Sequence, residues 1–238
     1  MHQVHRFDRL SSTQDEIHRL AASGAPAGTI VVAAEQAAGR GSRGRGWTSP
    51  RGGLWLTMLC RPASTDGVEL LGLRAGLAVA GALAELGGIP PAWLKWPNDV
   101  IVDDRKLGGI LCEARWQGAG LGWVAVGLGL NVRNSPPTDV RFPAASLAEW
   151  RSDLTPDEVL WPLVARLTPL AEAADALTAA EVAEFGSRDW LRGRAITAPV
   201  AGVAAGIGPD GGLRVRRPDG GVVVLRSGEA TAAVQLVP

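Results

Sequence analysis

A glycine- and arginine-rich segment between two apolar stretches is the first place where this sequence could do chemistry. Residues 39–50 read GRGSRGRGWTSP, and Trp47 closes the alternating run. Glycines let backbone N–H groups approach a ligand closely, and arginines present planar forks of donors to phosphate or carboxylate oxygens. The segment is not a Walker A loop, because no Gly-Lys-Ser/Thr follows it, and it lacks the helix of a dinucleotide fingerprint. It predicts an anion-binding loop that is mobile when empty and closes over its ligand.

Two other interpretations of this segment stay open when it is taken alone. Gly/Arg-rich segments occur in disordered RNA-binding tails, although those lie at chain ends or repeat many times, and a surface loop can carry incidental arginines. The 24 lysines and arginines balance 24 aspartates and glutamates, so no global basic field attracts nucleic acid or a membrane surface. The sequence therefore predicts a local anion site, with neither DNA nor a membrane as a partner.

Three further motifs follow the loop along the chain. They are KWPND at 95–99, KLGGIL at 106–111 and GLGLN at 127–131. Taken alone, Asn98 and Asp99 after a proline form an ordinary turn, and Lys106 beside a turn is a solvated surface lysine. The order of all four motifs is what indicates a functional site.

The elements that must position these motifs alternate between strands and helices. Apolar and β-branched runs predict strands, and longer apolar runs of helical character predict helices. Thr13 and Glu16 form a capping-box pattern at the start of the first helix, and 103–105 predicts a turn between two strands. The predicted strands are 3–7, 29–35, 53–60, 93–96, 100–104, 106–116 and 122–132, and the predicted helices are 13–23, 69–87 and 155–186.

A change in the sequence pattern near residue 190 predicts a second, smaller domain. From Gly193 onward, five short apolar segments alternate with glycine-rich turns, which is typical of a small β-barrel. The sequence therefore predicts an α+β fold, with a mixed β-sheet flanked by helices in residues 1–190 and a small β-barrel in residues 191–238.

The two cysteines and the N-terminus indicate the compartment. Cys60 and Cys112 follow apolar stretches and lack metal-ligand spacing, so we expect buried, reduced thiols. The N-terminal residues have no apolar core of signal-peptide length, and no apolar stretch is long enough to cross a bilayer. The expected location is cytoplasmic.

The four motifs together resemble those of the biotin–protein ligases, and the resemblance covers the chain from residue 3 onward. It implies a class II synthetase-like biotin/lipoate ligase catalytic domain followed by an SH3-like β-barrel. It also implies that ATP activates biotin as biotinyl-5′-AMP, and that the biotinyl group passes to a lysine of a biotin carboxyl carrier domain in an acyl-CoA or pyruvate carboxylase. ATP and Mg²⁺ would be co-substrate and activator, biotin the substrate, and no tightly bound prosthetic group is expected.

The resemblance implies a role for each matching residue. Lys106 and Arg40 are implied as catalytic groups. The implied biotin-binding residues are Ser12, Thr13, Gln14, Gln36, Gly39, Arg40, Gly41, Ser42, Lys106, Gly109, Leu111 and Gly127. The implied ATP-binding residues are Arg43, Arg45, Trp47, Asn98, Asp99, Gly129 and Asn131, and of these Asn98 and Asp99 would also hold the metal ion.

Two positions depart from the family pattern. Ser42 stands where arginine is usual, which puts tight retention of the adenylate in doubt, and Gln14 stands where asparagine is usual. The chain begins almost at the catalytic motifs, so we expect a monofunctional enzyme without an N-terminal DNA-binding domain or repressor activity. The alternatives are a lipoate ligase on the same fold, a nucleic-acid-binding module that uses the Gly/Arg loop, and a non-catalytic biotin sensor.

Two expectations concern packing and assembly. We expect Trp55, Trp116, Trp150 and Trp161 in the core. Related enzymes act as monomers or as homodimers paired through their sheets, and residues 122–130 are the predicted sheet edge for such a homodimer.

Overall fold

The larger of two β-sheets forms the centre of the molecule. The computed structural model describes residues 3–118, 120–137, 142–173 and 175–232. The sheet has the strand order β1-β2-β3-β7-β6-β5-β4. Its strands are β1 (Val4–Leu10), β2 (Ile30–Gln36), β3 (Leu54–Cys60), β4 (Ala92–Lys95), β5 (Asp99–Val102), β6 (Arg105–Gln117) and β7 (Gly120–Leu130). β1 and β2 are parallel and the other neighbours antiparallel, which confirms the predicted mixed sheet.

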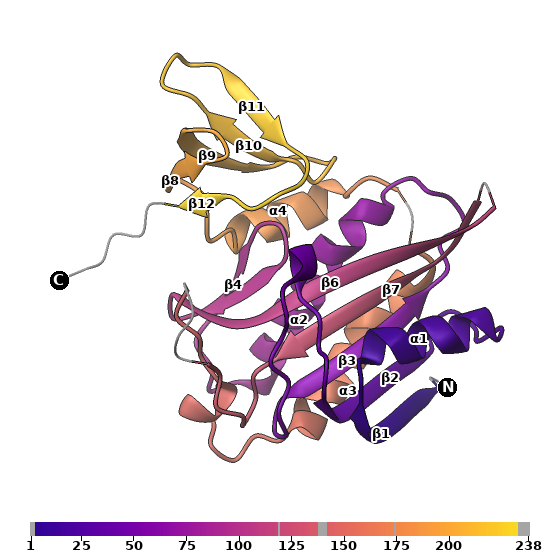
Figure 1. Ribbon diagram of the computed structural model, residues 1–238. Helices are drawn as coiled ribbons and strands as arrows, with labels where there is room; N and C mark the ends of the chain where they lie inside the picture. The colour runs from indigo at the N-terminus through magenta and orange to yellow at the C-terminus, as the bar shows by residue number, and fades with distance from the viewer. Residues whose placement is uncertain (1–2, 119, 138–141, 174, 233–238) are drawn as a thin grey trace.

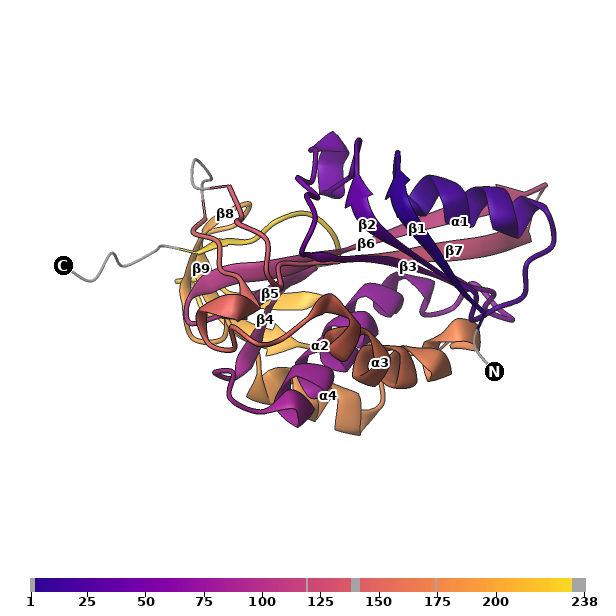
Figure 2. The ribbon, with the colours of Figure 1, turned by 90° about the horizontal axis from the view of Figure 1, so that it is seen from below.

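Helices cover both faces of this sheet (Figure 2). One face carries α1 (Thr13–Ala22), and the other carries α2 (Leu71–Leu86), α3 (Pro156–Leu167) and α4 (Ala179–Ser187). Strand β3 shows the consequence: Leu56 and Met58 lie in the core shared with α2, while Leu59 packs in a second cluster with Ile17 of α1. A strand covered on both faces needs a continuous apolar run, and LWLTMLC is such a run. Short 3₁₀ turns complete the helical elements at Ser42–Gly44, Val68–Leu70, Leu147–Glu149 and Thr168–Glu172.

The C-terminal segments form a second, antiparallel sheet that stands over one end of the first (Figure 1). Its strand order is β11-β10-β9-β8-β12, with β8 (Ala195–Ala198), β9 (Gly202–Ile207), β10 (Leu213–Arg216), β11 (Val222–Leu225) and β12 (Thr231–Ala232). The indole of Trp96 donates a hydrogen bond to the Gly211 carbonyl at 2.9 Å and so joins the two sheets. The five predicted segments are five strands, although residues 233–238 of the last one lie outside the described residues, and the domain division at 190/191 stays a prediction.

The first helix begins as predicted, but with a different cap. The hydroxyl of Ser12 accepts from the Gln14 backbone N–H, so Ser12, not Thr13, is the N-cap, and the predicted capping box is wrong. Thr13 instead donates its backbone N–H and its hydroxyl to the side chain of Gln36, at 2.8 and 3.1 Å. A tertiary partner has replaced the local one.

The predicted helix 155–186 is interrupted. α3 ends at Leu167 and the chain continues as the 3₁₀ turn Thr168–Glu172, where Pro169 has no backbone N–H to extend the α-helical hydrogen bonds. A new helix starts at Ala179, capped reciprocally by Thr178 and Glu181. Proline and capping signals within an alanine-rich stretch therefore divide it.

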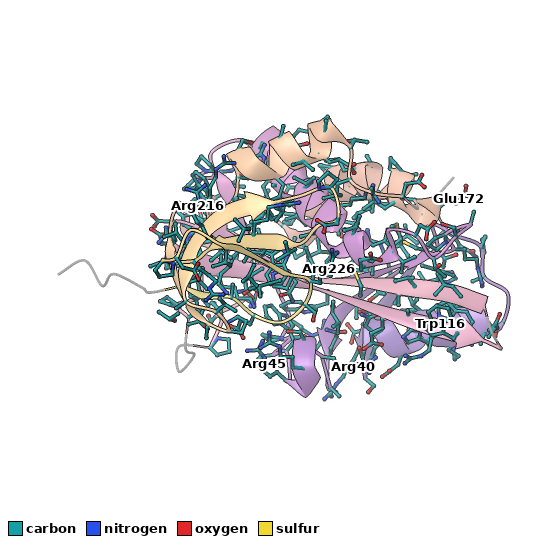
Figure 3. All side chains as sticks on the ribbon, turned by 90° about the horizontal axis from the view of Figure 1, so that it is seen from above. Arg40, Arg45, Trp116, Glu172, Arg216 and Arg226 are labelled. Carbon is teal, nitrogen blue, oxygen red and sulfur yellow. The ribbon has the colours of Figure 1, made fainter. Side chains whose placement is uncertain are left out.

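Several expectations about exposure are wrong. Trp55 is fully buried as predicted, but Trp116 and Trp161 are 60% and 53% exposed. Cys112 is also exposed, while Cys60 is buried, and both are free thiols. Trp116 pairs with Leu121 near the tip of the β6–β7 hairpin, and in the view of Figure 3 it lies on the other side of Arg40 from Arg45.

The predicted dimer edge is also wrong. β7 pairs with β3 on one side and β6 on the other, so it lies inside the sheet. The end strands of the sheet are β1 and β4. Leu94 of β4 forms a β-bridge with Asp189, so within the described ranges β1 is the end strand whose outer edge is free. No helix in those ranges is both long and apolar enough to cross a membrane.

Asp189, where the chain passes from α4 to the second sheet, predicts a measurable pH dependence of stability. Its carboxylate is buried, and its Oδ2 atom has no partner among the described residues. Burial raises its pKa from 3.8 to about 6, although the Leu191 and Arg192 backbones bond to it. The folded state therefore binds more protons than the unfolded state between about pH 4 and 6, and stability falls as the pH rises through that window. Asp189→Asn keeps an acceptor for the Leu191 N–H, and we expect it to raise the free energy of unfolding by about 1–3 kcal/mol at pH 7.5.

Urea unfolding at two pH values checks this expectation. The gain from Asp189→Asn should shrink when the same measurement is made at pH 4.5. An equal difference at both pH values would show that the charge of Asp189 is not what costs stability.

Candidate active site

A cavity opens on the α1 face of the large sheet, at the start of that helix. Its floor is formed where β6 and β7 carry glycine instead of side chains: Gly109 pairs with Gly129, and Gly127 pairs with Leu111. Leu128 and Leu130, between and beyond these glycines, point to the opposite face and belong to the α2 core. Alternation along one strand therefore makes a solid core on one face and a hollow of about 500 Å³ on the other.

Most of the predicted site residues line this one cavity. Those that do so are Ser12, Thr13, Gln14, Gln36, Arg40, Gly41, Ser42, Arg45, Trp47, Asn98, Asp99, Lys106, Gly109, Leu111, Gly127, Gly129 and Asn131. Gly39 and Arg43 are not among the lining residues. The individual ligand roles of all these residues stay predictions.

One end of the cavity is a network of uncharged polar groups at the start of α1. Gln36 accepts from Thr13 and donates from Nε2 to the Ser49 hydroxyl at 2.8 Å, which fixes the helix start to the end of the Gly/Arg loop. Thr57 of β3 donates to the Thr13 hydroxyl at 2.8 Å. Gln14 donates to the Leu111 carbonyl at 2.8 Å, and its buried Oε1 has no partner among the described residues. An unpaired buried acceptor is costly, so this atom marks a place for a donor from a ligand.

The Gly/Arg loop folds back on itself above the cavity. Trp47 N donates to the Gly39 carbonyl and Gly41 N to the Arg45 carbonyl, both at 2.8 Å. Gly39 fits because a side chain there would collide with the Trp47 backbone and Ser49. Arg43 adopts a positive φ of 61° at the tip, which is uncommon for a residue other than glycine. The loop is thus an ordered hairpin-like turn in this structure, and its closure over a ligand stays a prediction.

Carboxylates neutralise the arginines of this loop. Arg40 pairs with Asp15 at 2.6 Å and with Glu113 at 3.1 Å. Arg43 and Arg45 both reach Glu229 of the C-terminal segment, at 3.0 and 3.7 Å. The expected positive cluster is therefore a set of ion pairs, in which acidic side chains hold the guanidinium groups beside the cavity.

Ser42, where the family pattern has arginine, contacts its neighbour in the loop. Its hydroxyl accepts from Arg45 Nη2 at 3.2 Å, and its carbonyl accepts from Arg45 Nε at 3.3 Å. A serine at this position therefore orients Arg45, one of the three arginines of the loop, and adds no charge of its own.

Lys106 stands at the other end of the cavity as one member of a triad of charges. Its Nζ lies 2.5 Å from Asp99 Oδ1, and Lys95 Nζ lies 3.6 Å from Asp99 Oδ2. Segment 143–145 fixes the backbone of Lys106, which donates to the Pro143 carbonyl and accepts from Ala145 N. Because Asp99 has a second, buried cationic partner, Lys106 can turn toward an anionic ligand without leaving that carboxylate unpaired.

Trp47 lies between the two ends of the cavity. Its ring faces Lys106, with Nζ 5.2 Å from the ring centroid, and it lies against the bare backbone of Gly129. Its buried indole N–H has no acceptor within the described residues. A flat aromatic surface with an unused donor suits a purine base or a similar planar polar group.

The two asparagines make structural contacts while lining the cavity. Asn98 donates to the Ile110 carbonyl at 2.9 Å. Asn131 donates to the Ala145 carbonyl and accepts from Asn134, at 3.0 and 2.9 Å. Both side chains therefore shape the loops around Lys106.

The residues present do not form a resident metal site. Asp99 is the one carboxylate of the predicted pair, and two ammonium groups already share it. Across the ranges that the structure describes, three or more His, Cys, Asp or Glu side chains nowhere gather as metal ligands. A magnesium ion acting here would therefore bring most of its oxygen ligands from a polyphosphate and from water.

Several lining residues were missed by the sequence analysis. They include Lys95, Phe142, Trp190 and Glu229. Lys95 had a local signal, because it opens the KWPND motif. Trp190 and Glu229 had none, because they reach the cavity through the packing of the C-terminal sheet.

Comparison with known proteins agrees with this geometry. The chain is 40% identical over 141 residues to a biotin–[acetyl-CoA-carboxylase] ligase of Paracoccus denitrificans, covering 58% of each chain. It is 39% identical over 147 residues to the bifunctional ligase/repressor BirA of Bacillus subtilis, covering 60% of this chain and 45% of that one. It thus spans about half the length of the curated relatives it matches. Its fold is similar to that of a biotin protein ligase from Aquifex aeolicus in complex with biotin and ATP, with a TM-score of 0.81 and 27% identity over 98% of this chain and 99% of that one.

The matched family model shows which fold family carries this cavity. It is that of the biotin/lipoate A/B protein ligase family, and it matches residues 6–131. This range contains the Gly/Arg loop, the KWPND motif, Lys106 and the glycine floor. The chain therefore belongs to the biotin/lipoate A/B protein ligase family.

Proposed function

We propose that this chain is an ATP-dependent biotin–protein ligase, EC 6.3.4.15, which forms biotinyl-5′-AMP and transfers the biotinyl group to a lysine of a biotin carboxyl carrier domain. The observation that carries the proposal is the single cavity, in which an uncharged polar end at Thr13 and Gln36 is followed by Lys106, Asp99 and the arginine loop. The titles of the similar proteins support it, since they name biotin ligases and a complex with biotin and ATP.

The polar end of the cavity suits a ureido ring. A cyclic urea offers N–H donors and one carbonyl acceptor, and the cavity offers the unpaired Gln14 Oε1 and hydroxyl groups from Ser12 and Thr13. The glycine floor provides room for an apolar ring and chain. Lipoate lacks ureido N–H groups and would leave the Gln14 acceptor unpaired, so we favour biotin.

The charged end suits the joining of two acids. Biotin's carboxylate must attack the α-phosphate of ATP, and two unit charges about 4 Å apart repel by about 4 kcal/mol at an effective dielectric near 20. Arg40, Arg45 and Lys106 can offset this repulsion once they exchange their carboxylate partners for substrate oxygens. The same groups stabilise negative charge on the phosphate as pyrophosphate leaves. Attack by the acceptor lysine on the mixed anhydride then gives the amide and AMP.

The remaining assignments are part of the same proposal. ATP brings Mg²⁺ with its phosphates, and the acceptor is the carrier domain of an acyl-CoA or pyruvate carboxylase. The two free thiols favour a reducing, cytoplasmic location. A homodimer paired through the large sheet would have to use β1, where Arg6, Asp8 and Arg9 place charges that disfavour edge-to-edge pairing.

Radiolabelled pyrophosphate exchange and mass spectrometry test the proposal. We expect exchange of pyrophosphate into ATP that depends on biotin and is not supported by lipoate, followed by an increase in carrier-domain mass equal to one biotinyl group. Exchange with lipoate in place of biotin would assign the other ligase activity of the family. Biotin binding without pyrophosphate release would indicate a sensor and contradict the proposal.

A further inference from the structure

A chain of three side chains lies behind Arg40, outside the residues discussed as ligands. Trp123 of β7 donates its indole N–H to His18 Nδ1 of α1 at 2.9 Å. His18 Nε2 lies 2.8 Å from Glu113 Oε2 of β6. Glu113 accepts from Arg40 Nε at 3.1 Å and from Nη2 at 3.2 Å. Three elements of the rigid domain therefore converge on one guanidinium group of the loop.

The direction of these hydrogen bonds follows from the chemistry of the groups. An indole nitrogen can only donate, so His18 Nδ1 is the acceptor and the ring proton lies on Nε2. That proton is donated to Glu113, which therefore receives hydrogen bonds from His18 on one side and from Arg40 on the other. The hydrogen bond from His18, followed by those from Arg40, lowers the pKa of Glu113 to about 2 against the opposing effect of burial. Glu113 is thus an ionised and oriented anchor.

The second acid on Arg40 differs from Glu113 in its setting. Asp15 bonds to Nη1 at 2.6 Å, but its side chain is 51% exposed, while that of Glu113 is 19% exposed. No residue behind Asp15 orients it among the contacts that the structure describes. Water or a substrate oxygen can replace Asp15, whereas Glu113 is fixed from behind through His18.

We propose that Glu113 is a positioning residue that sets the orientation of Arg40 in the reaction, and that His18, held by Trp123, orients Glu113. The proposal rests on the ligase function given above, in which Arg40 acts on the reacting carboxylate and phosphate. Glu113 contacts neither biotin nor ATP in this scheme and acts only through the guanidinium. Its loss should therefore affect the rate of adenylate formation more than the binding of biotin, whose ring is held at the Thr13 end.

The first test is a comparison of Glu113→Gln with the unaltered protein. We expect the single-turnover rate of adenylate formation to fall by about 10- to 100-fold, because small errors in the position of a reacting group have effects of this size. The dissociation constant for biotin, measured by calorimetry without ATP, should change by less than about 3-fold, as for a group that acts on the reaction step. Glu16→Gln is the matched control, since Glu16 lies on α1 and pairs with Arg19 instead of Arg40, and it should leave the rate unchanged.

A double-mutant cycle separates positioning from general stabilisation. Arg40→Lys removes the guanidinium group that Glu113 orients. In that background, Glu113→Gln should therefore lower the rate by less than about 3-fold. If the two substitutions instead multiply their effects, Glu113 does not act through Arg40 and the proposal is overturned.

Substitutions of His18 keep the test valid if Glu113→Gln does not fold. Glutamine can accept from Trp123 and donate to Glu113 as the neutral ring does, so His18→Gln should retain most of the rate. His18→Leu removes both contacts and should lower the rate by about 10-fold. Equal rates for the two variants would overturn the proposal.

Pyrophosphate exchange by the unaltered protein separates failure of the ligase function from failure of the positioning role of Glu113. Biotin-dependent exchange in the unaltered protein with an undiminished rate in Glu113→Gln and His18→Leu would remove the positioning role alone. No exchange in the unaltered protein would remove the ligase function and, with it, the role of Glu113.

Discussion

Lys106→Ala is expected to lower the rate of adenylate formation by about 10²–10³-fold, the usual loss when one preorganised donor is removed from a reacting anion. Lys106 lies beside Gly109 of the glycine floor and faces Trp47, and the proposed function places the carboxylate and the α-phosphate there. The readout is single-turnover formation of biotinyl-AMP at saturating biotin and ATP. Stability should change little, because Asp99 keeps Lys95 as a cationic partner at 3.6 Å.

Arg105→Ala is the control for Lys106→Ala. Arg105 is the neighbouring cation in sequence, but it pairs with Glu149 at 2.6 Å on the outside of the domain. It should therefore show nearly the rate of the unaltered protein. An unchanged rate of adenylate formation in Lys106→Ala would remove this lysine from the reaction.

The sequence predicted the parts of the fold that depend on local patterns. Strand β3 is a continuous apolar run, and the turn at Asp103 and Asp104 places both residues at positive φ, near 51° and 52°, as a two-residue hairpin turn requires. The resemblance implied Gly127 and Gly129 of GLGLN as ligand-binding residues, and their alternation along a strand does place them on one face. Signals of this kind need only a few neighbouring residues.

Contacts between distant segments could not be predicted in the same way. Nothing near Thr13 shows that Gln36, 23 residues later, takes up its N–H and hydroxyl. The positive loop was evident from composition, but its carboxylate partners at Glu113 and Glu229 come from a strand and a C-terminal segment whose placement only the folded chain determines. The sequence therefore identified the arginines of the loop and missed the acids that hold them.

The predicted burial of two residues on β6 was wrong for a related reason. Cys112 follows the apolar stretch GGIL on β6, and Trp116 is itself a large apolar side chain, so both look like core residues. Trp116 is exposed because it lies near the tip of the β6–β7 hairpin, whereas Cys112 is exposed although its Sγ lies beside Gly72 at the start of α2. Whether a strand residue is buried depends on what lies opposite it, which the strand itself does not encode.

The second large effect is expected for Gly129→Val, which should reduce adenylate formation to below about 1% of the unaltered rate. A Cβ atom at position 129 would lie 2.5 Å from Trp47 Nε1 and 2.9 Å from Cε2, far inside normal contact distance. The indole must then leave its place between Lys106 and the floor, and the added methyl groups would fill the space that it vacates. The backbone pairing of β7 and the core packing of Leu128 and Leu130 on its other face should survive, so the variant should fold.

Gly120→Val is the control on the same strand, since a Cβ there would meet only the Gln117 carbonyl at 3.9 Å. Calorimetry adds a second readout: Gly129→Val should weaken ATP binding more than biotin binding, because Trp47 lies away from the Thr13 end of the cavity. Equal loss of both ligands would show that the two ends of the cavity are not independent. Full activity would show that Trp47 can leave the cavity without cost, and its unpaired indole N–H would then have no part in holding a nucleotide.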